Sequence, residues 1–276
     1  FIKENRFPNL WKLARIVPIN KIAIPIDKSD YRPISILPCL SKIYEKIILG
    51  QLLTYIENTG IYKESICGFR KGYSTGTALM KLVDDIKKAM KASELTLIVL
   101  VDFSKAFDTI CHDSLIRKMH QLNFSKDFLK WTLSYLSNRN QYVQIDADQS
   151  KISRTQTGVP QGSILGPILF NLYVNDLKDN ISSHTIQYAD DTTIYKSCHP
   201  RAIKDAETDI TNSLKSLSSW SSMNHLAANS IKTKYLICGS SRLCKLHKVP
   251  DHQSRVDFNG TVLEQENSVK LLGIKI

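Results

Sequence analysis

The stretch Gln187-Tyr188-Ala189-Asp190-Asp191-Thr192 places two adjacent carboxylates between two short β-branched runs, 184–187 and 192–195. A run, a turn and a second run predict a β-hairpin with the acidic pair at its tip. Two like charges side by side repel each other, so a tight turn that carries both favours a bound cation. We therefore expect a divalent metal ion at this turn.

A third carboxylate, Asp102, ends the apolar run 95–101, which has the length and β-branching of a buried strand. A carboxylate at a strand end beside a carboxylate hairpin can hold two Mg²⁺ about 3.5–4 Å apart, the arrangement used for in-line displacement at phosphorus. The pattern therefore favours polymerase chemistry.

The composition is that of an ordinary globular protein. Of 276 residues, 42% are hydrophobic and 23% are charged, enough for one large domain or two lobes with a sizeable core. No apolar run reaches the roughly 18 residues that a transmembrane helix needs, so we expect no membrane contact. The start at Phe1 is neither a signal peptide nor an initiator Met, so we expect a piece of a longer polypeptide.

The formal net charge is +11, and it is unevenly distributed. The excess of basic over acidic side chains is +7 in residues 1–90, zero in 91–200 and +4 in 201–276. An acidic site between basic ends suits a protein that binds a polyanion, although a basic surface can also serve solubility alone. The six cysteines have no zinc-site spacing, which predicts reduced thiols in an intracellular protein.

Periodicity and turn residues predict the order of elements. Residues 1–37 are predicted to be extended and punctuated by prolines, with apolar pieces such as 15–19 forming edge strands or strand ends. Helical spacing begins at Leu40 and stops at Asn58 and Gly60, and a second helix is expected to have Thr75 as its N-cap. Further helices are predicted at about 113–122 and 126–137, within 164–177, and after Pro200. Further strands are predicted at 141–145, 234–238, 258–263 and 269–276.

Seven sequence blocks stand out in order: Asp30 to Ser35 (DYRPIS), Gly68 to Gly72 (GFRKG), Val101 to Asp108 (VDFSKAFD), Gly158 to Ser163 (GVPQGS), Tyr188 to Asp191 (YADD), Lys232 to Lys234 (KTK) and Leu271 to Gly273 (LLG). Together they resemble the reverse transcriptase domain of non-LTR retrotransposons of the jockey and LINE-like kind, over nearly the whole chain. The first two look like fingers motifs, the next three like polymerase motifs A, B and C, and the last two like the end of motif D and the primer grip.

The resemblance implies an α/β (α+β) right-hand polymerase with fingers and palm, in which helices cover a central antiparallel sheet. Residues 1–94 are expected to be fingers-like and 95–276 to be palm, with some fingers helices inserted at about 113–157. We expect no thumb in the sequence up to Ile276. One departure is Ala228-Asn229, where the family usually has a bulky apolar residue before the Asn. We expect this to change only the packing of a helix end.

The same resemblance implies catalytic and metal-binding roles. Asp102, Asp190 and Asp191 would hold two Mg²⁺, with the carbonyl of Phe103 completing one coordination shell and Mn²⁺ able to substitute. Lys232 would either protonate the leaving pyrophosphate or only neutralise it.

Nucleotide-binding roles follow in the same way. Arg32 and Arg70 would clamp the triphosphate, since a guanidinium binds phosphate oxygens in a bidentate manner. Phe107 would lie under the sugar and exclude a 2′-OH, and Gln161 and Gly162 would lie against the nucleotide and the template base. Each role has an alternative. Phe107 would only pack in the core, Arg32 and Arg70 would only be solvated, and Gln161 and Gly162 would only form a loop before a helix.

The implied function is RNA-templated DNA synthesis, with an RNA template, a DNA primer and dNTP substrates. Leu272 and Gly273 would form the primer grip, and the site of action would be intracellular, in the nucleus. Two alternatives are an inactive nucleic-acid-binding relic and an RNA-dependent RNA polymerase. The three intact carboxylates argue against the relic, and Phe107 argues against the RNA polymerase.

Overall fold

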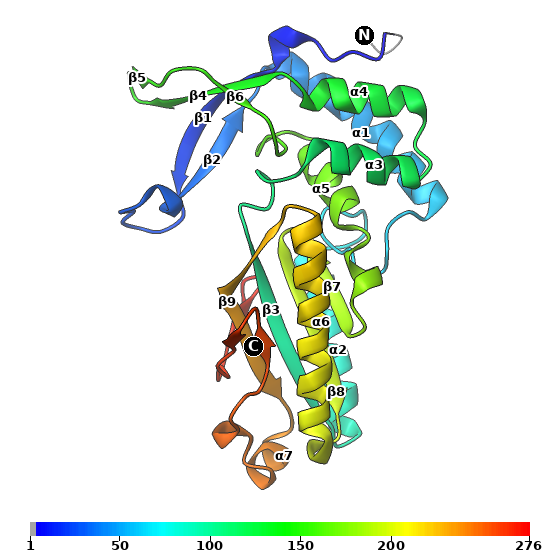
Figure 1. The fold of residues 1–276 in the computed structure, drawn as a ribbon, viewed down its shortest axis with the longest axis vertical. Helices are drawn as coiled ribbons and strands as arrows, with labels where there is room; N and C mark the ends of the chain where they lie inside the picture. Colours follow the sequence, from blue (N-terminus) through cyan, green and yellow to red (C-terminus); the bar gives the residue numbers. More distant parts are fainter. Residues whose placement is uncertain (1–3) are drawn as a thin grey trace. The chain divides into compact units, whose positions relative to one another are not determined.

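A computed structural model describes residues 4–276, which form two compact units (Figure 1). The first contains the chain up to Tyr62 together with Lys105–Tyr173, and the second contains Lys63–Ser104 and Val174–Ile276. The predicted ranges were 1–94 and 95–276, with some fingers helices inserted at about 113–157. In the structure, residues 63–94 group with the second unit and residues 105–173 with the first. The naming of those ranges as fingers and palm stays a prediction.

The first unit combines helices with a mixed sheet of order β2-β1-β4-β5, in which β6 also pairs with β4. Its strands are β1 (Leu13–Asn20), β2 (Tyr31–Ile36), β4 (Arg139–Ile145), β5 (Asp148–Gln149) and β6 (Ser153–Thr155). Its helices are η1 (Asn9–Trp11), η2 (Lys28–Asp30), α1 (Cys39–Thr59), α3 (His112–Gln121), α4 (Lys126–Leu136) and most of α5 (Gly166–Val174). The predicted edge position holds for β2, whereas β1 lies between β2 and β4.

Local signals set the helix boundaries in this unit. α1 ends at Gly60, which has φ +61° as expected for a left-handed C-cap, so the predicted stop is confirmed. The predicted helices near 113–122 and 126–137 correspond to α3 and α4. Helix α5 has Pro167 in its first turn, where the missing N–H costs nothing. An aromatic cluster around Phe7 includes an edge-on contact with Tyr135 at 4.9 Å between ring centroids.

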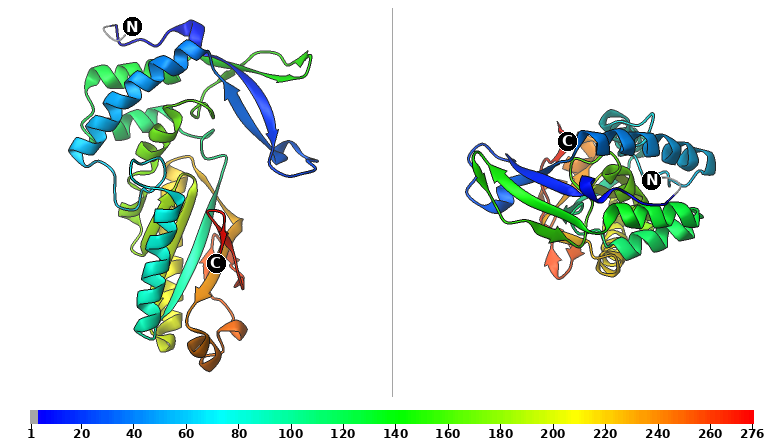
Figure 2. Two further views of the ribbon diagram at one scale, coloured as in Figure 1. Left: turned by 180° about the vertical axis from the view of Figure 1, so that it is seen from behind. Right: turned by 90° about the horizontal axis from the view of Figure 1, so that it is seen from above.

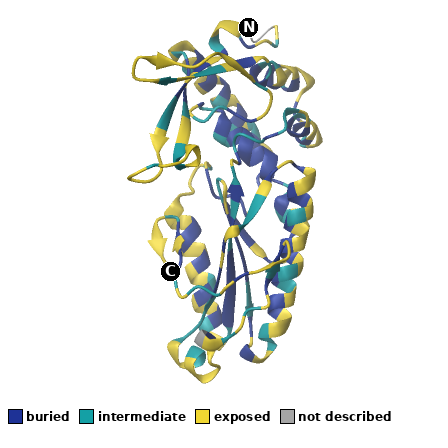
Figure 3. Cartoon of the chain, turned by 60° about the vertical axis from the view of Figure 1, so that its left-hand side comes forward, coloured by how far each residue is buried: buried dark blue, intermediate teal, exposed yellow. Residues whose placement is uncertain are grey.

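The second unit is built on an antiparallel sheet of order β7-β8-β3-β9, which confirms the predicted central antiparallel sheet. Its strands are β3 (Leu95–Ser104), β7 (His184–Tyr188), β8 (Asp191–Cys198) and β9 (Ala227–Cys238). The long helices α2 (Thr75–Lys91) and α6 (Ile203–Met223) cover its two faces (Figures 1 and 2). In Figure 3 the central strands are buried along most of their length.

Apolar stripes hold these helices on the sheet. Leu79, Leu82 and Ile86 of α2 form a buried cluster with residues of β3, β7, β8 and β9, which places residues 75–91 in this unit. The N-cap of α2 is Ser74, whose hydroxyl accepts a hydrogen bond from the Thr77 amide, so the expected cap at Thr75 is wrong by one residue. The hydroxyl of Thr77 accepts a bond from the Ser74 amide in return, and this capping box favours the earlier start.

The remaining elements of the second unit are short. They are η3 (Leu177–Asn180), η4 (Pro200–Ala202), α7 (Ser241–Leu246), η5 (Val249–Asp251), β10 (Asp257–Phe258), β11 (Thr261–Val262), β12 (Lys270–Leu271) and β13 (Ile274–Lys275). The last four form two small hairpins, in agreement with the predicted strands at the end of the chain. Among the described residues, no helix is both long enough and apolar enough to cross a membrane.

Candidate active site

The β7–β8 hairpin presents two carboxylates at its turn, which confirms the predicted hairpin. Tyr188 pairs with Asp191, so Ala189 and Asp190 form a two-residue turn between the strands. Ala189 has φ +56°, a value suited to the first position of a tight hairpin turn. Both Asp190 and Asp191 are exposed to solvent.

Asp102 lies on the neighbouring strand. Val101 of β3 pairs with Thr192 of β8 in antiparallel register. Asp102, the next residue of β3, therefore lies beside Asp191 of β8. On its other side, Asp102 pairs with Asn229 of β9, after a shift in register that begins at Leu100. Such a bulge bends a strand and redirects its side chains. Strand pairing thus brings all three predicted carboxylates to one edge of the sheet.

The three carboxylates interact electrostatically. The pKa of Asp191 is raised to about 6 by partial burial of the Asp191 carboxylate, together with the negative charges of Asp190 and Asp102. Asp191 as a residue remains exposed, so water screens part of this repulsion. A divalent cation placed among the three groups would replace repulsion by attraction.

The donor set fits a hard divalent cation, because carboxylate and carbonyl oxygens are the ligands that Mg²⁺ prefers. Within residues 4–276, however, no three His, Cys, Asp or Glu side chains are gathered into a ready-made metal cluster. Carboxylates repel one another when no cation lies between them. Phe103, whose carbonyl is a predicted ligand, has a buried side chain and pairs with Ala228 of β9.

The loop before α2 packs directly on the β7–β8 hairpin. The amide of Cys67 donates to the carbonyl of Gln187 at 2.8 Å. A Cβ placed on Gly68 would lie 2.4 Å from the backbone nitrogen of Ala189, so only glycine fits there. Arg70, a predicted phosphate ligand, donates to the carbonyls of Lys63 and Ile66 at 3.4 Å. Its guanidinium also lies over the Tyr73 ring, so Arg70 holds its own loop together.

Lys232 lies in an irregular part of β9. Leu100 pairs with Lys234 and Asp102 pairs with Asn229. Positions two apart on β3 therefore face positions five apart on β9. The side chain of Asn229 accepts hydrogen bonds from the amides of Ile231 and Lys232 at 3.1 and 3.2 Å, which stabilises this bulge. Lys232 is therefore an exposed side chain in a bulge beside the strand that carries Asp102.

The expectation that Ala228-Asn229 lies at a helix end was wrong. Helix α6 ends at Met223, and Ala228 lies in β9, where it pairs with Phe103. The small side chain therefore belongs to a strand rather than to a helix end.

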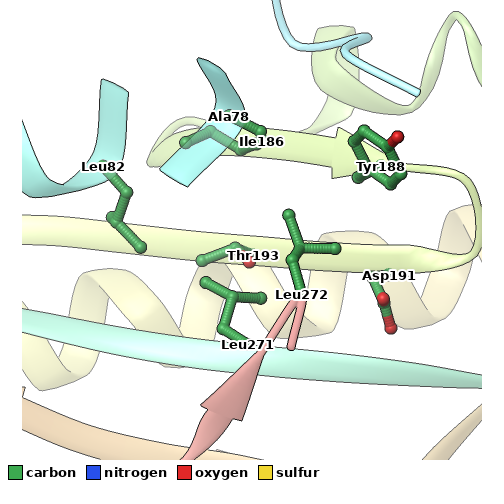
Figure 4. Close-up of a pocket in the computed structure, with 8 residues that line it drawn as sticks. All are labelled: Ala78, Leu82, Ile186, Tyr188, Asp191, Thr193, Leu271 and Leu272. Carbon is green, nitrogen blue, oxygen red and sulfur yellow. The ribbon is translucent and has the colours of Figure 1, made fainter. Parts of the chain in front are cut away.

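The predicted primer grip is the turn of the β12–β13 hairpin. Leu272 and Gly273 have φ +47° and +90°, and two residues with positive φ are typical of a type I′ turn. A bulky side chain seldom adopts this conformation, which marks Leu272 as a position held by its surroundings. Leu272 lines an apolar pocket together with Tyr188 and Asp191 (Figure 4). The hairpin thus lies next to the end of the sheet that carries the carboxylates.

The first unit holds the other predicted nucleotide contacts. The ring of Phe107 is half-buried and stacks on Phe170, with 4.5 Å between the centroids, which is consistent with core packing as well as with a surface for substrate. The side-chain amide of Gln161 donates to Asp108 at 2.9 Å. Gly162 has φ +120°, and a Cβ there would lie 2.6 Å from the carbonyl oxygen of Ser35.

Strand β2 connects Arg32 to this loop. The amide of Ser35 donates to the carbonyl of Gln161 at 2.6 Å, so β2 runs beside the loop at 157–163. Arg32, three residues earlier in β2, pairs with Ile19 of β1 and is exposed. The structure therefore groups Phe107, Gln161, Gly162 and the strand of Arg32 within the first unit.

Three residues that support this loop were not predicted. The buried side chain of Glu45 accepts hydrogen bonds from the amides of Ile164 and Leu165 at 2.8 and 3.3 Å. His112 Nε2 donates to the carbonyl of Gly158 at 2.8 Å, and Asp108 accepts from Gln161. The sequence held one signal for Glu45: its carboxylate lies on the face of α1 that also carries the buried residues Ser41 and Ile48. A buried charge needs hydrogen-bond partners, so this position predicts that Glu45 binds polar groups elsewhere in the fold.

Comparison with known proteins agrees with this geometry. The family described as reverse transcriptase (RNA-dependent DNA polymerase) matches residues 19–276. The probable RNA-directed DNA polymerase from transposon BS of Drosophila melanogaster is 30% identical over 279 residues, covering 98% of this chain and 30% of that protein. The corresponding protein of transposon X-element, from the same species, is 33% identical over 239 residues, covering 84% of this chain and 26% of that protein.

A solved structure shows the same fold. Apo telomerase from Candida tropicalis, truncated from its C-terminal domain, superimposes with a TM-score of 0.56 at 13% identity, over 84% of this chain and 52% of that one. The fold is a right-hand polymerase fold, as predicted. The chain spans about 30% of the length of the transposon BS protein. The resemblance to non-LTR retrotransposon enzymes is confirmed, and the chain belongs to the reverse transcriptase (RNA-dependent DNA polymerase) family.

Proposed function

We propose that this chain catalyses RNA-templated DNA synthesis, adding dNTPs to the 3′-OH of a primer. The observation that carries the proposal is the convergence of Asp102, Asp190 and Asp191, from two paired strands and one turn, at one edge of the second unit's sheet. Partial burial and the repulsion from Asp190 and Asp102 raise the pKa of Asp191, and this repulsion supports a cation-binding role. The cellular location would be the nucleus.

Residues of the second unit would bind the metal ions, the leaving pyrophosphate and the primer. Asp102, Asp190, Asp191 and the carbonyl of Phe103 would hold two Mg²⁺, which when bound supply activation of the 3′-OH and charge neutralisation of the pyrophosphate. Lys232 would donate a proton to the pyrophosphate or balance its charge. Leu272 and Gly273 would support the primer backbone.

Residues of the first unit and the loop before α2 would select the nucleotide. Phe107 would exclude a ribose 2′-OH, and Gln161, fixed by Asp108, would present its amide with little loss of entropy. The exposed guanidinium of Arg32 would contact the triphosphate. Arg70 would contribute through the shape of its loop, because its guanidinium already binds backbone carbonyls.

The test is primer extension on poly(rA)/oligo(dT) with Mg²⁺, comparing the wild type with Asp190→Asn and with the matched variant Asp148→Asn at an exposed position in β5. We expect Asp190→Asn to lose at least ~10³-fold in kcat while its affinity for template and primer is unchanged. Asp148→Asn should match the wild type. Retained activity in Asp190→Asn would contradict the metal assignment, and a wild type that binds but never extends would favour an inactive relic.

A polymerase that makes RNA is the second candidate, because both enzymes share the palm chemistry. Supplying rNTPs in place of dNTPs in the same assay separates the two. Extension with rNTPs that equals extension with dNTPs would favour the RNA polymerase, whereas the aromatic side chain at Phe107 supports a preference for dNTPs.

A further inference from the structure

The two ends of strand β3 differ in charge. Asp102 lies near the last residue of the strand, while the first residue, Leu95, pairs with Cys198, and Thr96 pairs with Cys238. Leu95 and Asp102 are seven positions apart on β3, a distance of about 23 Å at roughly 3.3 Å per residue. The far end of the sheet is thus well separated from the three carboxylates.

Three segments meet at this far end. Residues 87–94 form the last turn of α2 and lead into Leu95, residues 199–205 follow Cys198, and residues 241–251 follow β9. A Cβ on Gly239 would lie 2.5 Å from the Leu95 side chain and 3.1 Å from Cys244 Sγ, so α7 packs against the start of β3. Figure 1 and the left view of Figure 2 show α7, the start of α6 and the end of α2 at the same end of this unit. We call these three segments the basic end.

The basic end carries eight Lys or Arg residues and three Asp or Glu residues in 26 positions. The eight are all exposed: Lys87, Lys88, Lys91, Arg201, Lys204, Arg242, Lys245 and Lys248. Within residues 4–276, Lys88 is the one member of this set that forms an ion pair, with Asp84 and Asp85 of its own helix. The other seven cations therefore reach solvent with no carboxylate within ion-pair distance.

A concentration of unpaired cations attracts polyanions. Each phosphate that a Lys or Arg neutralises releases condensed counterions, and this term supplies most sequence-independent binding to nucleic acid. The opposite end of β3 repels phosphate unless a cation is bound there, because it presents three carboxylates. The charge pattern of this unit therefore favours a second contact with a nucleic-acid backbone, away from the position where bases are copied.

We propose that the basic end binds the phosphate backbone of a template segment outside the copied region. The proposal rests on the proposed function in one respect, since it takes RNA as the nucleic acid that the chain holds. It adds a contact about 23 Å from Asp102 along β3, beyond a template that ends close to the copied position.

The test compares two primer-templates in a binding titration with the full 276-residue chain. One is a short RNA template with its primer, and the other carries an added RNA hairpin, which is also made as DNA. The variant Arg242→Gln/Lys245→Gln/Lys248→Gln removes three charges from α7 and the residues that follow it. The matched control, Lys46→Gln/Lys126→Gln/Lys130→Gln, removes three exposed charges from the first unit.

We expect the wild type to bind the hairpin-bearing template more tightly than the short one, and the α7 variant to lose this gain. The slope of log affinity against log salt concentration should be shallower for the α7 variant than for the wild type by about 2 to 3, since each lost phosphate contact removes roughly 0.9 from the slope. Extension on the short template should be unchanged, which separates this proposal from the proposed function. Loss on either hairpin supports a phosphate contact, and the arm with the larger loss identifies RNA or DNA as its source.

Three results would overturn the proposal: wild-type affinity of the α7 variant on both hairpins, an equal loss in the control variant, or an equal loss on the short template. Melting temperatures of all variants verify that the fold is retained, which is expected because the substituted side chains are exposed.

Discussion

The loop at 157–163 and the hairpin turn at 188–191 both present predicted functional residues, but they are held in different ways. The hairpin turn is held by its own strands, with Tyr188 paired to Asp191, and by the close approach of Gly68. The loop belongs to no strand ladder. Single backbone hydrogen bonds join it to Ser35 of β2 and to the carbonyls of Phe107 and Ile110. Side chains from distant parts of the first unit, among them Glu45, Asp108 and His112, hold the loop and the segment that follows it.

This difference has a consequence for function. Two strands define a turn by a ladder of backbone hydrogen bonds, so the position of its carboxylates is insensitive to single side-chain changes. A loop held by side chains responds to each of them, because every lost partner leaves a backbone donor or acceptor unsatisfied. We therefore expect substitutions around the loop to alter substrate selection and stability, and changes in the backbone around the hairpin to alter catalysis.

Phe107→Ala should produce the largest change on the loop side. Removing the ring opens space for a 2′-OH, so the ratio of kcat/KM for rNTP over dNTP should rise by ~10- to 1,000-fold while the three carboxylates remain in place. Core packing against Phe170 predicts a different result, a loss of about 3–5 kcal/mol in unfolding free energy with little change in that ratio. Steady-state kinetics together with a melting curve distinguish the two.

Gly68→Ala tests the hairpin side. The new methyl group would lie 2.4 Å from the backbone nitrogen of Ala189, so the turn must move. We expect kcat to fall by ~10²-fold, since displacements near 1 Å are costly at a reacting centre. The control is Gly50→Ala, in the middle of α1, where nothing lies within 4 Å of an added Cβ. Normal kcat in Gly68→Ala would show that the turn tolerates displacement.

The same comparison explains what could be predicted from the sequence. The hairpin at 184–195 and the stop of α1 at Gly60 depend on residues close together in the chain, and both were predicted. The partners of the loop lie far away: Glu45 is 119 residues from Ile164, and Asp108 is 53 residues from Gln161. Local periodicity carries no information about such pairs, so the supports of the loop were missed.

The boundaries of the compact units also depend on contacts between distant residues. The predicted fingers-like range 1–94 included residues 63–94, which the structure groups with the second unit. Helix α2 of that range buries Leu82 and Ile86 against β3, β7 and β8. An amphipathic stripe predicts that a helix is covered, but it does not identify which sheet covers it.

Glu45→Gln should lower stability by a moderate amount. Glu45 is fully buried, and its two oxygens accept from the Ser41 hydroxyl and from two backbone amides of the segment that follows the loop. A side-chain NH₂ group in place of one oxygen would face a donor, which costs about 1.5–3 kcal/mol. Urea denaturation measures this loss. Glu57→Gln, an exposed change on the same helix, should stay within about 0.5 kcal/mol of the wild type.

His112→Gln should give the smallest effect, and only at low pH. Burial lowers the pKa of His112 below its usual value, although its bond to the Gly158 carbonyl opposes this shift. The unfolded chain then binds the proton more readily, so the histidine destabilises the fold progressively as pH falls below about 6.5. Glutamine keeps a donor for Gly158 and does not titrate in this range.

The expected result is a difference in melting temperature, variant minus wild type, that becomes more positive by on the order of 1–2 °C between pH 7.5 and 5.5. His120→Gln is the matched control, since it removes an exposed imidazole from the same helix. A pH-independent difference for His112→Gln would mean that His112 supports the loop as a neutral donor without a protonation penalty. The loop and the hairpin turn would then differ in their hydrogen-bond partners but not in their sensitivity to pH.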